Sequence, residues 1–263
     1  MSETQLLLGL CGGGVVGFVL GLVGGGGSIL AVPLMIYLVG VPNAHVAVGT
    51  SAVAVAANAA AGLAGHARRG RVDWRCGGLF SMGGVLGALL GAQAGKLVDG
   101  TRLTVLFALL MLGVATSMLM KRGGGSEDGR DGAEDGGGRT SRLLGVGAGT
   151  GMLSGFFGIG GGFLIVPGLM GTARLPALRA CSTSLLAVTA FGMTTAVSYA
   201  WSGLVCWRLA ALFIVGGTVG MMLGTRLAGR LAAGRRLLPV LATTILAVGV
   251  YILLRGLRGD VGA

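Results

Sequence analysis

Two runs of glycine interrupt apolar segments of this chain, and each is followed by a pair of hydroxyl side chains. Glycine leaves backbone N–H groups unshielded, and a helix that begins after the run adds the positive end of its dipole. Two such groups brought together would form a neutral, donor-rich cradle for an oxyanion. The sequence therefore predicts an anion-binding site built from Gly24, Gly25, Gly26, Gly27, Ser28, Thr50, Ser51, Asn58, Gly158, Gly160, Gly161, Gly162, Thr183 and Ser184.

Each of these residues also has a simpler interpretation. The glycines could serve tight helix packing alone, and each Thr-Ser pair could be an ordinary helix N-cap. Asn58, an amide deep in an apolar segment, either lines the anion path or bonds between helices. His45 and His66 lie at the ends of apolar segments, where we expect them at the membrane interface.

The two runs belong to an internal repeat. Pro33 and Pro167 are 134 residues apart, and Thr50 and Thr183 are 133 apart. At the second offset Gly83, Gly84 and Gly87 match Gly216, Gly217 and Gly220. We therefore divide the chain into a first transmembrane repeat (1–120), a flexible charged linker (121–142) and a second transmembrane repeat (143–263). A glycine-interrupted apolar segment in both halves is typical of a secondary transporter's binding site.

Composition defines the class. The mean hydropathy is +0.85, and 11% of residues are charged, against roughly 25% in soluble domains. Apolar runs recur at about the 17–25 residues that a membrane-spanning helix needs. The net charge of +11 comes from basic residues at the ends of these runs and not from one patch, which excludes a nucleic-acid surface. The sequence predicts an all-α polytopic membrane protein in a lipid bilayer and leaves a homodimer open.

Each half is expected to contain a glycine-broken helix or hairpin followed by three spans. The helices are predicted at 6–23, 28–39, 45–65, 76–94 and 103–120, then at 143–157, 163–170, 178–200, 209–228 and 237–254. A retained first span is expected because the first residues lack the basic start of a signal peptide.

The glycine runs allow two topologies. If each run only kinks one helix, the chain crosses eight times, with 12 basic residues on one face and 8 on the other. If each run is the tip of a hairpin, the halves are inverted, and 15 of the 20 basic residues share a face. The positive-inside rule favours the hairpins, with both termini outside and the 121–142 linker in the cytoplasm.

Several chemistries are missing from the sequence. Acidic and basic residues occur in the apolar runs only near their ends, which argues against a cation transporter or a buried proton relay. The GGGGS run lacks the lysine of a P-loop, and no catalytic motif occurs, so we expect neither an enzyme nor a cofactor. The four cysteines are scattered without a CxxC spacing, so we expect no metal site.

The paired motifs carry a family resemblance. Two glycine breaks, each followed by Val32-Pro33 or Val166-Pro167 and by Gly49-Thr50-Ser51 or Ser182-Thr183-Ser184, resemble the TauE/SafE family of sulfite and organosulfur anion exporters, including 4-toluenesulfonate uptake permease-like members. The resemblance covers all but the linker. It implies a permease of the bacterial inner (plasma) membrane that exports small anions such as sulfite or sulfoacetate. The alternatives are an uptake permease for another small anion and a membrane assembly factor without transport.

Overall fold

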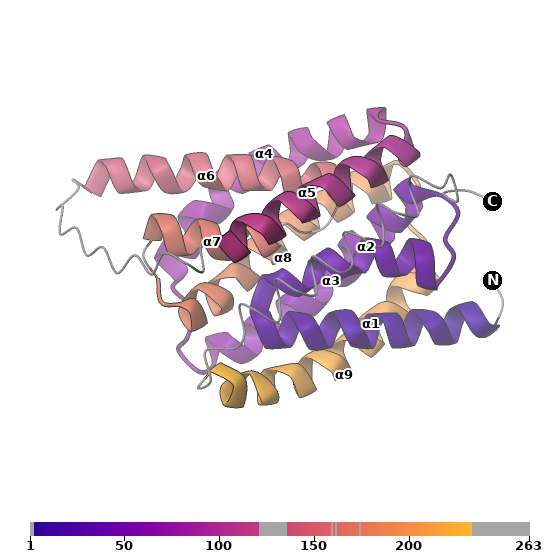
Figure 1. The fold of residues 1–263 in the computed structure, drawn as a ribbon, viewed down its shortest axis with the longest axis horizontal. Coiled ribbons are helices and arrows are strands. Elements are labelled where there is room, and N and C mark those ends of the chain that lie inside the picture. The colour runs from indigo at the N-terminus through magenta and orange to yellow at the C-terminus, as the bar shows by residue number, and fades with distance from the viewer. Residues whose placement is uncertain (1–2, 121–135, 159, 161, 174, 233–263) are drawn as a thin grey trace.

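The first glycine run turns the chain back on itself. The computed structural model describes residues 3–120, 136–158, 160, 162–173 and 175–232 (Figure 1). Helix α1 (Glu3–Val23) leads into a 3₁₀ helix, η1 (Gly24–Leu30), a short α2 (Ala31–Pro33) and a π-helical turn, η2 (Leu34–Leu38). A Cβ on Gly27 would overlap the backbone of Leu20, and one on Gly12 would lie 3.6 Å from the Leu38 side chain. The returning segment therefore runs antiparallel to α1 as a hairpin, not as a kinked continuation.

The second run makes the same turn. Helix α6 (Gly136–Phe157) ends at Gly158, whose φ of 65° lies in the left-handed region that glycine adopts without steric cost. Helix α7 (Gly162–Ala173) then returns along α6, and a Cβ on Gly168 would lie 3.3 Å from the Val146 side chain.

Long helices follow each hairpin. These are α3 (Ala44–Ala67), α4 (Trp74–Leu97) and α5 (Gly100–Met120), then α8 (Ala177–Trp201) and α9 (Trp207–Ala232). In the part of the chain that the structure describes, the segments long and apolar enough to cross a membrane are Thr4–Leu22, Ala44–Ala67, Trp74–Leu97, Arg179–Trp201 and Trp207–Leu227. The described residues contain no strand, so the expected all-helical membrane protein is confirmed at this level.

Helices of the two halves pack on each other in a crossed arrangement. Helix α1 lies along α9, and α6 lies along α4, while α3 and α8 pack together between these pairs (Figure 1). Glycine permits the close approach, since a Cβ on Gly87 would overlap the carbonyl of Ala148 and one on Gly220 would overlap the carbonyl of Gly14. The glycine-rich faces of these helices are thus contact surfaces between the halves.

The same contacts occur twice, 133 or 134 residues apart. Gly83 and Gly91 approach the carbonyls of Leu144 and Met152, and their counterparts Gly216 and Gly224 approach those of Leu10 and Phe18. In the reverse direction, Gly17 packs against Gly217 as Gly151 packs against Gly84. The repeat read from the sequence therefore corresponds to a repeated set of interhelical contacts.

The predicted end of the linker differs from the structure. The sequence predicts a linker over 121–142, whereas α6 begins at Gly136, because the helix extends toward the N-terminus beyond the apolar residues that mark it in the sequence. The rest of that linker, Gly161 of the predicted site and the last predicted span, 237–254, lie outside the described residues.

Candidate functional site

The two glycine runs meet backbone to backbone. A Cβ on Gly25 would lie 2.7 Å from the Cα of Gly162, and one on Gly162 would overlap the Gly25 carbonyl. All seven residues of η1 are buried, which includes Gly24, Gly26, Gly27 and Ser28. The structure therefore brings together the two runs that the sequence paired.

A hydroxyl of the second half accepts a hydrogen bond from a backbone N–H of the first glycine run. The Gly25 N–H donates to Ser184 Oγ over 3.1 Å, and that hydroxyl donates to the carbonyl of Cys181 over 2.8 Å. Ser28 Oγ donates to the Gly25 carbonyl over 2.9 Å. The N–H and the carbonyl of Gly25 thus both have hydrogen-bond partners inside the protein, as a buried irregular backbone requires.

Each run also packs against the first turns of the long helix in the other half. Gly24, with φ of 74°, would overlap the Cys181 carbonyl if it carried a Cβ, and Gly158 would overlap Val48 in the same way. Ser51 Oγ donates to the carbonyl of Val48 over 2.9 Å, as Ser184 does to that of Cys181. Ser51 and Ser184 therefore occupy matching places behind the two runs.

The threonines differ from the expectation in position and in hydrogen bonding. Thr50 and Thr183 were expected to donate hydroxyls at helix starts, but α3 already begins at Ala44 and α8 at Ala177. Asn43 is the N-cap of α3, accepting from the N–H groups of His45 and Val46, so the N-cap alternative is wrong as well.

Both buried hydroxyls accept hydrogen bonds from the other half. The Cys206 N–H donates to Thr50 Oγ1 over 3.0 Å, and the Asp73 N–H donates to Thr183 Oγ1 over 3.0 Å. Asp73 is the N-cap of α4, and Cys206 directly precedes α9. Thr183 and Thr50 therefore fix the starts of α4 and α9, respectively.

Asn58 faces a different helix. Thr218 Oγ1 donates to Asn58 Oδ1 over 3.2 Å, and Asn58 Nδ2 donates to the carbonyl of Phe213 over 3.5 Å. Among the described residues, the hydrogen bonds of Asn58 run to α9 and not to either glycine run. Gly160, with φ of 69°, lies between α8 and α3, since its Cβ would be 3.1 Å from the Val188 side chain and 3.2 Å from that of Val55.

His66 is buried, which the sequence did not indicate. Its side chain is 8% exposed, and Nδ1 lies 3.1 Å from the Oγ of Ser182, the first residue of the Ser182-Thr183-Ser184 motif. Its place at the end of an apolar segment suggested an interfacial residue. Burial depends on the packing of α8 beside α3, for which the local sequence carries no signal.

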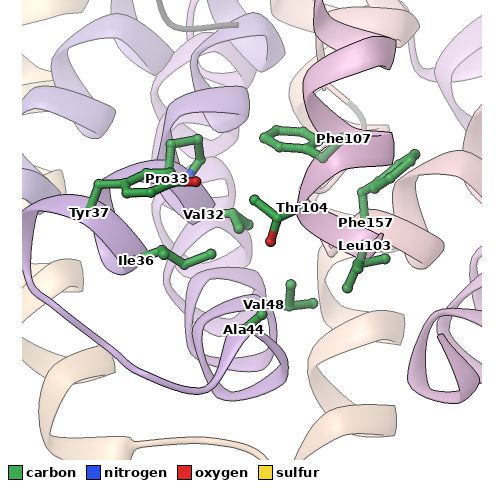
Figure 2. Close-up of a pocket in the computed structure, with 10 residues that line it drawn as sticks. All are labelled: Val32, Pro33, Ile36, Tyr37, Ala44, Val48, Leu103, Thr104, Phe107 and Phe157. Carbon is green, nitrogen blue, oxygen red and sulfur yellow. The ribbon is translucent and has the colours of Figure 1, made fainter. Parts of the chain in front are cut away.

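A separate pocket, shown in Figure 2, is lined mainly by apolar side chains of the first hairpin, α3 and α5, together with Phe157. Thr104 contributes a hydroxyl, and this hydroxyl already donates to the Gly100 carbonyl over 2.9 Å. The pocket therefore offers little to a charged ligand and lies apart from Ser184 and Gly25.

The site is a closed, uncharged cluster of donors at the contact between two halves. It contains backbone N–H groups and hydroxyls, with no acidic or basic side chain in either glycine run. Among the described residues no cluster of histidine, cysteine, aspartate or glutamate could hold a metal ion. Paired, glycine-interrupted segments of this kind are typical of secondary transporters.

Comparison with known proteins agrees with this class. The model of the family described as "Sulfite exporter TauE/SafE" matches residues 9–252, so the chain belongs to this family. Members of the family are membrane transporters and not enzymes. A probable membrane transporter protein of Xylella fastidiosa strain Temecula1 is 48% identical over 256 residues, covering 97% of each chain. The Bacillus subtilis probable membrane transporter protein YunE is 26% identical over 261 residues, covering 92% of this chain and 95% of its own length. No solved structure matches the chain.

Proposed function

We propose that this transporter carries small anions, sulfite or an organosulfonate such as sulfoacetate, across the bacterial inner membrane and holds the anion at the paired glycine runs. The family is described as sulfite exporters, and its match spans almost the whole chain. The site residues offer hydrogen-bond donors without carboxylates, which suits an anion and disfavours a cation.

The hydrogen bond from Gly25 to Ser184 is the observation that carries the proposal. Ser184 Oγ accepts from Gly25 N–H at a buried contact between the two halves. An oxyanion can replace this hydroxyl as the acceptor for Gly25 N–H, and Ser184 can then turn its own O–H toward the anion. Ser184 Oγ thus occupies the acceptor position that the anion would take. When the two runs separate, the anion would replace Ser184 as the acceptor for Gly25 N–H.

The repeat suggests how access alternates. We infer that the two halves are inverted relative to each other and that each glycine hairpin reaches only partway across the bilayer. The short apolar segments Gly24–Leu38 and Leu164–Ala173 support this, since about 1.5 Å of rise per residue leaves them shorter than the hydrocarbon core. Rocking of one half against the other would then open the runs to either side.

Reporter fusions test the inverted topology. With 15 of 20 basic residues on the cytoplasmic face, a C-terminal alkaline phosphatase fusion should be active and a C-terminal green fluorescent protein fusion dark. A fluorescent fusion would contradict the inverted hairpins.

Proteoliposomes test the binding site. In vesicles loaded with sulfite, Ser184→Ala should weaken anion binding by roughly 10- to 100-fold, the loss of a hydrogen bond to a charged ligand worth about 1.5–3 kcal/mol. Thr116→Val is the matched control, because this exposed α5 hydroxyl bonds only to its own helix.

Binding is read as the rise in melting temperature with sulfite, so that any change in the unliganded protein is measured separately. Unchanged sulfite affinity in a folded Ser184→Ala protein would remove the glycine runs from the site. The direction of net flux in the same vesicles distinguishes export from uptake, and no flux with any anion would favour an assembly factor.

A further inference from the structure

A second polar site lies between the ends of α3 and α9. It is a cavity of about 340 Å³ whose polar lining is His66, Arg69, Thr218, Thr225 and Arg226, with small and apolar residues of the same two helices completing the wall. Both arginines are exposed, whereas His66 is buried. Its volume is at the lower end of the about 300–1,000 Å³ that small-molecule sites occupy.

Two polar connections lead inward from this cavity. His66 Nδ1 lies 3.1 Å from Ser182 Oγ, and Ser182 is two residues from Ser184, which accepts from Gly25. Thr218 Oγ1 donates to buried Asn58 over 3.2 Å. The wall of the cavity thus connects through Ser182 with the helix that carries Ser184, and through Thr218 with the buried amide of Asn58.

The corresponding place between α8 and α4 carries different side chains. At an offset of 133 residues, Arg69 and Arg226 correspond to Ser202 and Gln93, and His66 corresponds to Tyr199. Lys96 Nζ donates to Ser202 Oγ over 2.9 Å and to Gln93 Oε1 over 3.4 Å, and it lies 5.3 Å from the centre of the Tyr199 ring. Between α8 and α4, Lys96 therefore bonds the residues that correspond to Arg69 and Arg226.

We propose that the cavity between α3 and α9 is a vestibule that binds a small oxyanion before it reaches the glycine runs. The two guanidinium groups supply both the attraction and the hydrogen-bond donors. This inference rests on the proposed function, because it takes the glycine runs as the destination. It adds a charged site of entry on one side of the molecule only, beside the basic loop 66–75.

The arginines could also hold the phosphate of an anionic lipid, since basic pockets between membrane helices bind such head groups. The shared chemistry is a tetrahedral or pyramidal oxyanion. The inward connections, from His66 to Ser182 and from Thr218 to Asn58, favour a solute on its way to the glycine runs. We therefore commit to the solute and make the lipid an outcome of the test.

The experiment measures sulfite binding to the full chain in phosphatidylcholine nanodiscs, at constant ionic strength. Arg69→Gln and Arg226→Gln should each weaken binding by about 3- to 10-fold, because exposed charges are partly screened by water. Arg68→Gln removes the same charge from a neighbouring exposed residue that does not line the cavity, and its affinity should equal that of the unaltered protein.

Ser184→Ala separates this inference from the proposed function. If Ser184→Ala loses binding while both arginine variants bind normally, the vestibule is overturned and the glycine site stands. If the arginine variants lose binding and Ser184→Ala does not, the vestibule stands without the glycine site. If the arginine variants differ from the unaltered protein only after phosphatidylglycerol is added, the cavity holds a lipid phosphate, and the solute vestibule is overturned.

Discussion

The α3–α9 contact and the α8–α4 contact share a backbone arrangement and differ in their side chains. Asn58 on α3 bonds Thr218 on α9, whereas Phe191, at the position matching Asn58, stacks on Phe80 of α4 with ring centroids 6.3 Å apart. Val85 stands at the place of Thr218. One contact is therefore sealed by aromatic packing and the other by an amide and a hydroxyl.

The difference shows which part of a duplicated fold can diverge. The glycines of both halves approach backbone carbonyls so closely that a side chain would alter the distance between helices. The buried side chains between these helices have no such constraint. A hydrogen-bonded pair such as Asn58 and Thr218, or an aromatic pair such as Phe191 and Phe80, can fill the space between two helices. The halves could thus retain a common packing while only one acquired a polar cavity.

Glycine substitutions on the two contacts test the shared part and should have the largest effect. Gly87→Val and Gly220→Val each place a side chain on a carbonyl oxygen, of Ala148 and of Gly14. Each should lower the free energy of unfolding by about 3 kcal/mol, the upper end of the usual cost of overpacking. Fluorescence-detected size exclusion should show an equal loss of folded protein in both.

Gly149→Val is the control for these variants, since nothing lies within 4 Å of a Cβ at that position on α6. If either of the two contact variants folds as well as this control, the close backbone approach is not needed on that side.

Exchanging the side chains that differ should separate transport from stability. Asn58→Leu loses hydrogen bonds that are worth about 0.6–2 kcal/mol inside a membrane, and it should lower anion flux by roughly 10-fold, equivalent to about 1.4 kcal/mol. Phe191→Leu should cost stability by about 1 kcal/mol through poorer packing and leave flux unchanged. Melting temperature and sulfite flux, measured on the same preparations, check both statements. Equal flux losses would mean that neither contact is specialised.

The smallest effects are expected at the paired threonines. Thr50→Val and Thr183→Val leave the N–H groups of Cys206 and Asp73 without their acceptors, at a cost of about 1 kcal/mol each. The two melting temperatures should fall by a similar amount, about 2–4 °C. A fall in only one variant would show that the two sides do not depend equally on this bond.

The positions of many helices follow from the sequence, because the length of an apolar segment and the glycines and prolines that bound it are local signals. The segment predicted at 45–65 is α3 at Ala44–Ala67, and that at 209–228 is α9 at Trp207–Ala232. The matching prolines and glycines also indicated that the two runs are equivalent, and the structure places Gly25 beside Gly162.

The remaining features depend on distant packing. Asn43 after Pro42 is a recognisable cap, and it would have placed the start of α3 ahead of Thr50. Nothing local indicates that the Thr50 hydroxyl meets the backbone of Cys206, 156 residues away, or that His66 meets Ser182, 116 residues away. Such partners are fixed only when α8 and α9 pack beside α3.

The crossed pairing of helices sets an order of assembly during synthesis. Helix α1 ends at Val23, and its partner α9 begins only at Trp207. At about 5–20 residues per second, the glycine face of α1 waits roughly 10–40 s for that partner. A chain arrested before α9 should therefore expose Gly13 and Gly17 to a lipid-borne cross-linker placed beside them, and release of the full chain should remove that exposure. In the nascent protein, the bilayer itself covers the surface that the second half later occupies.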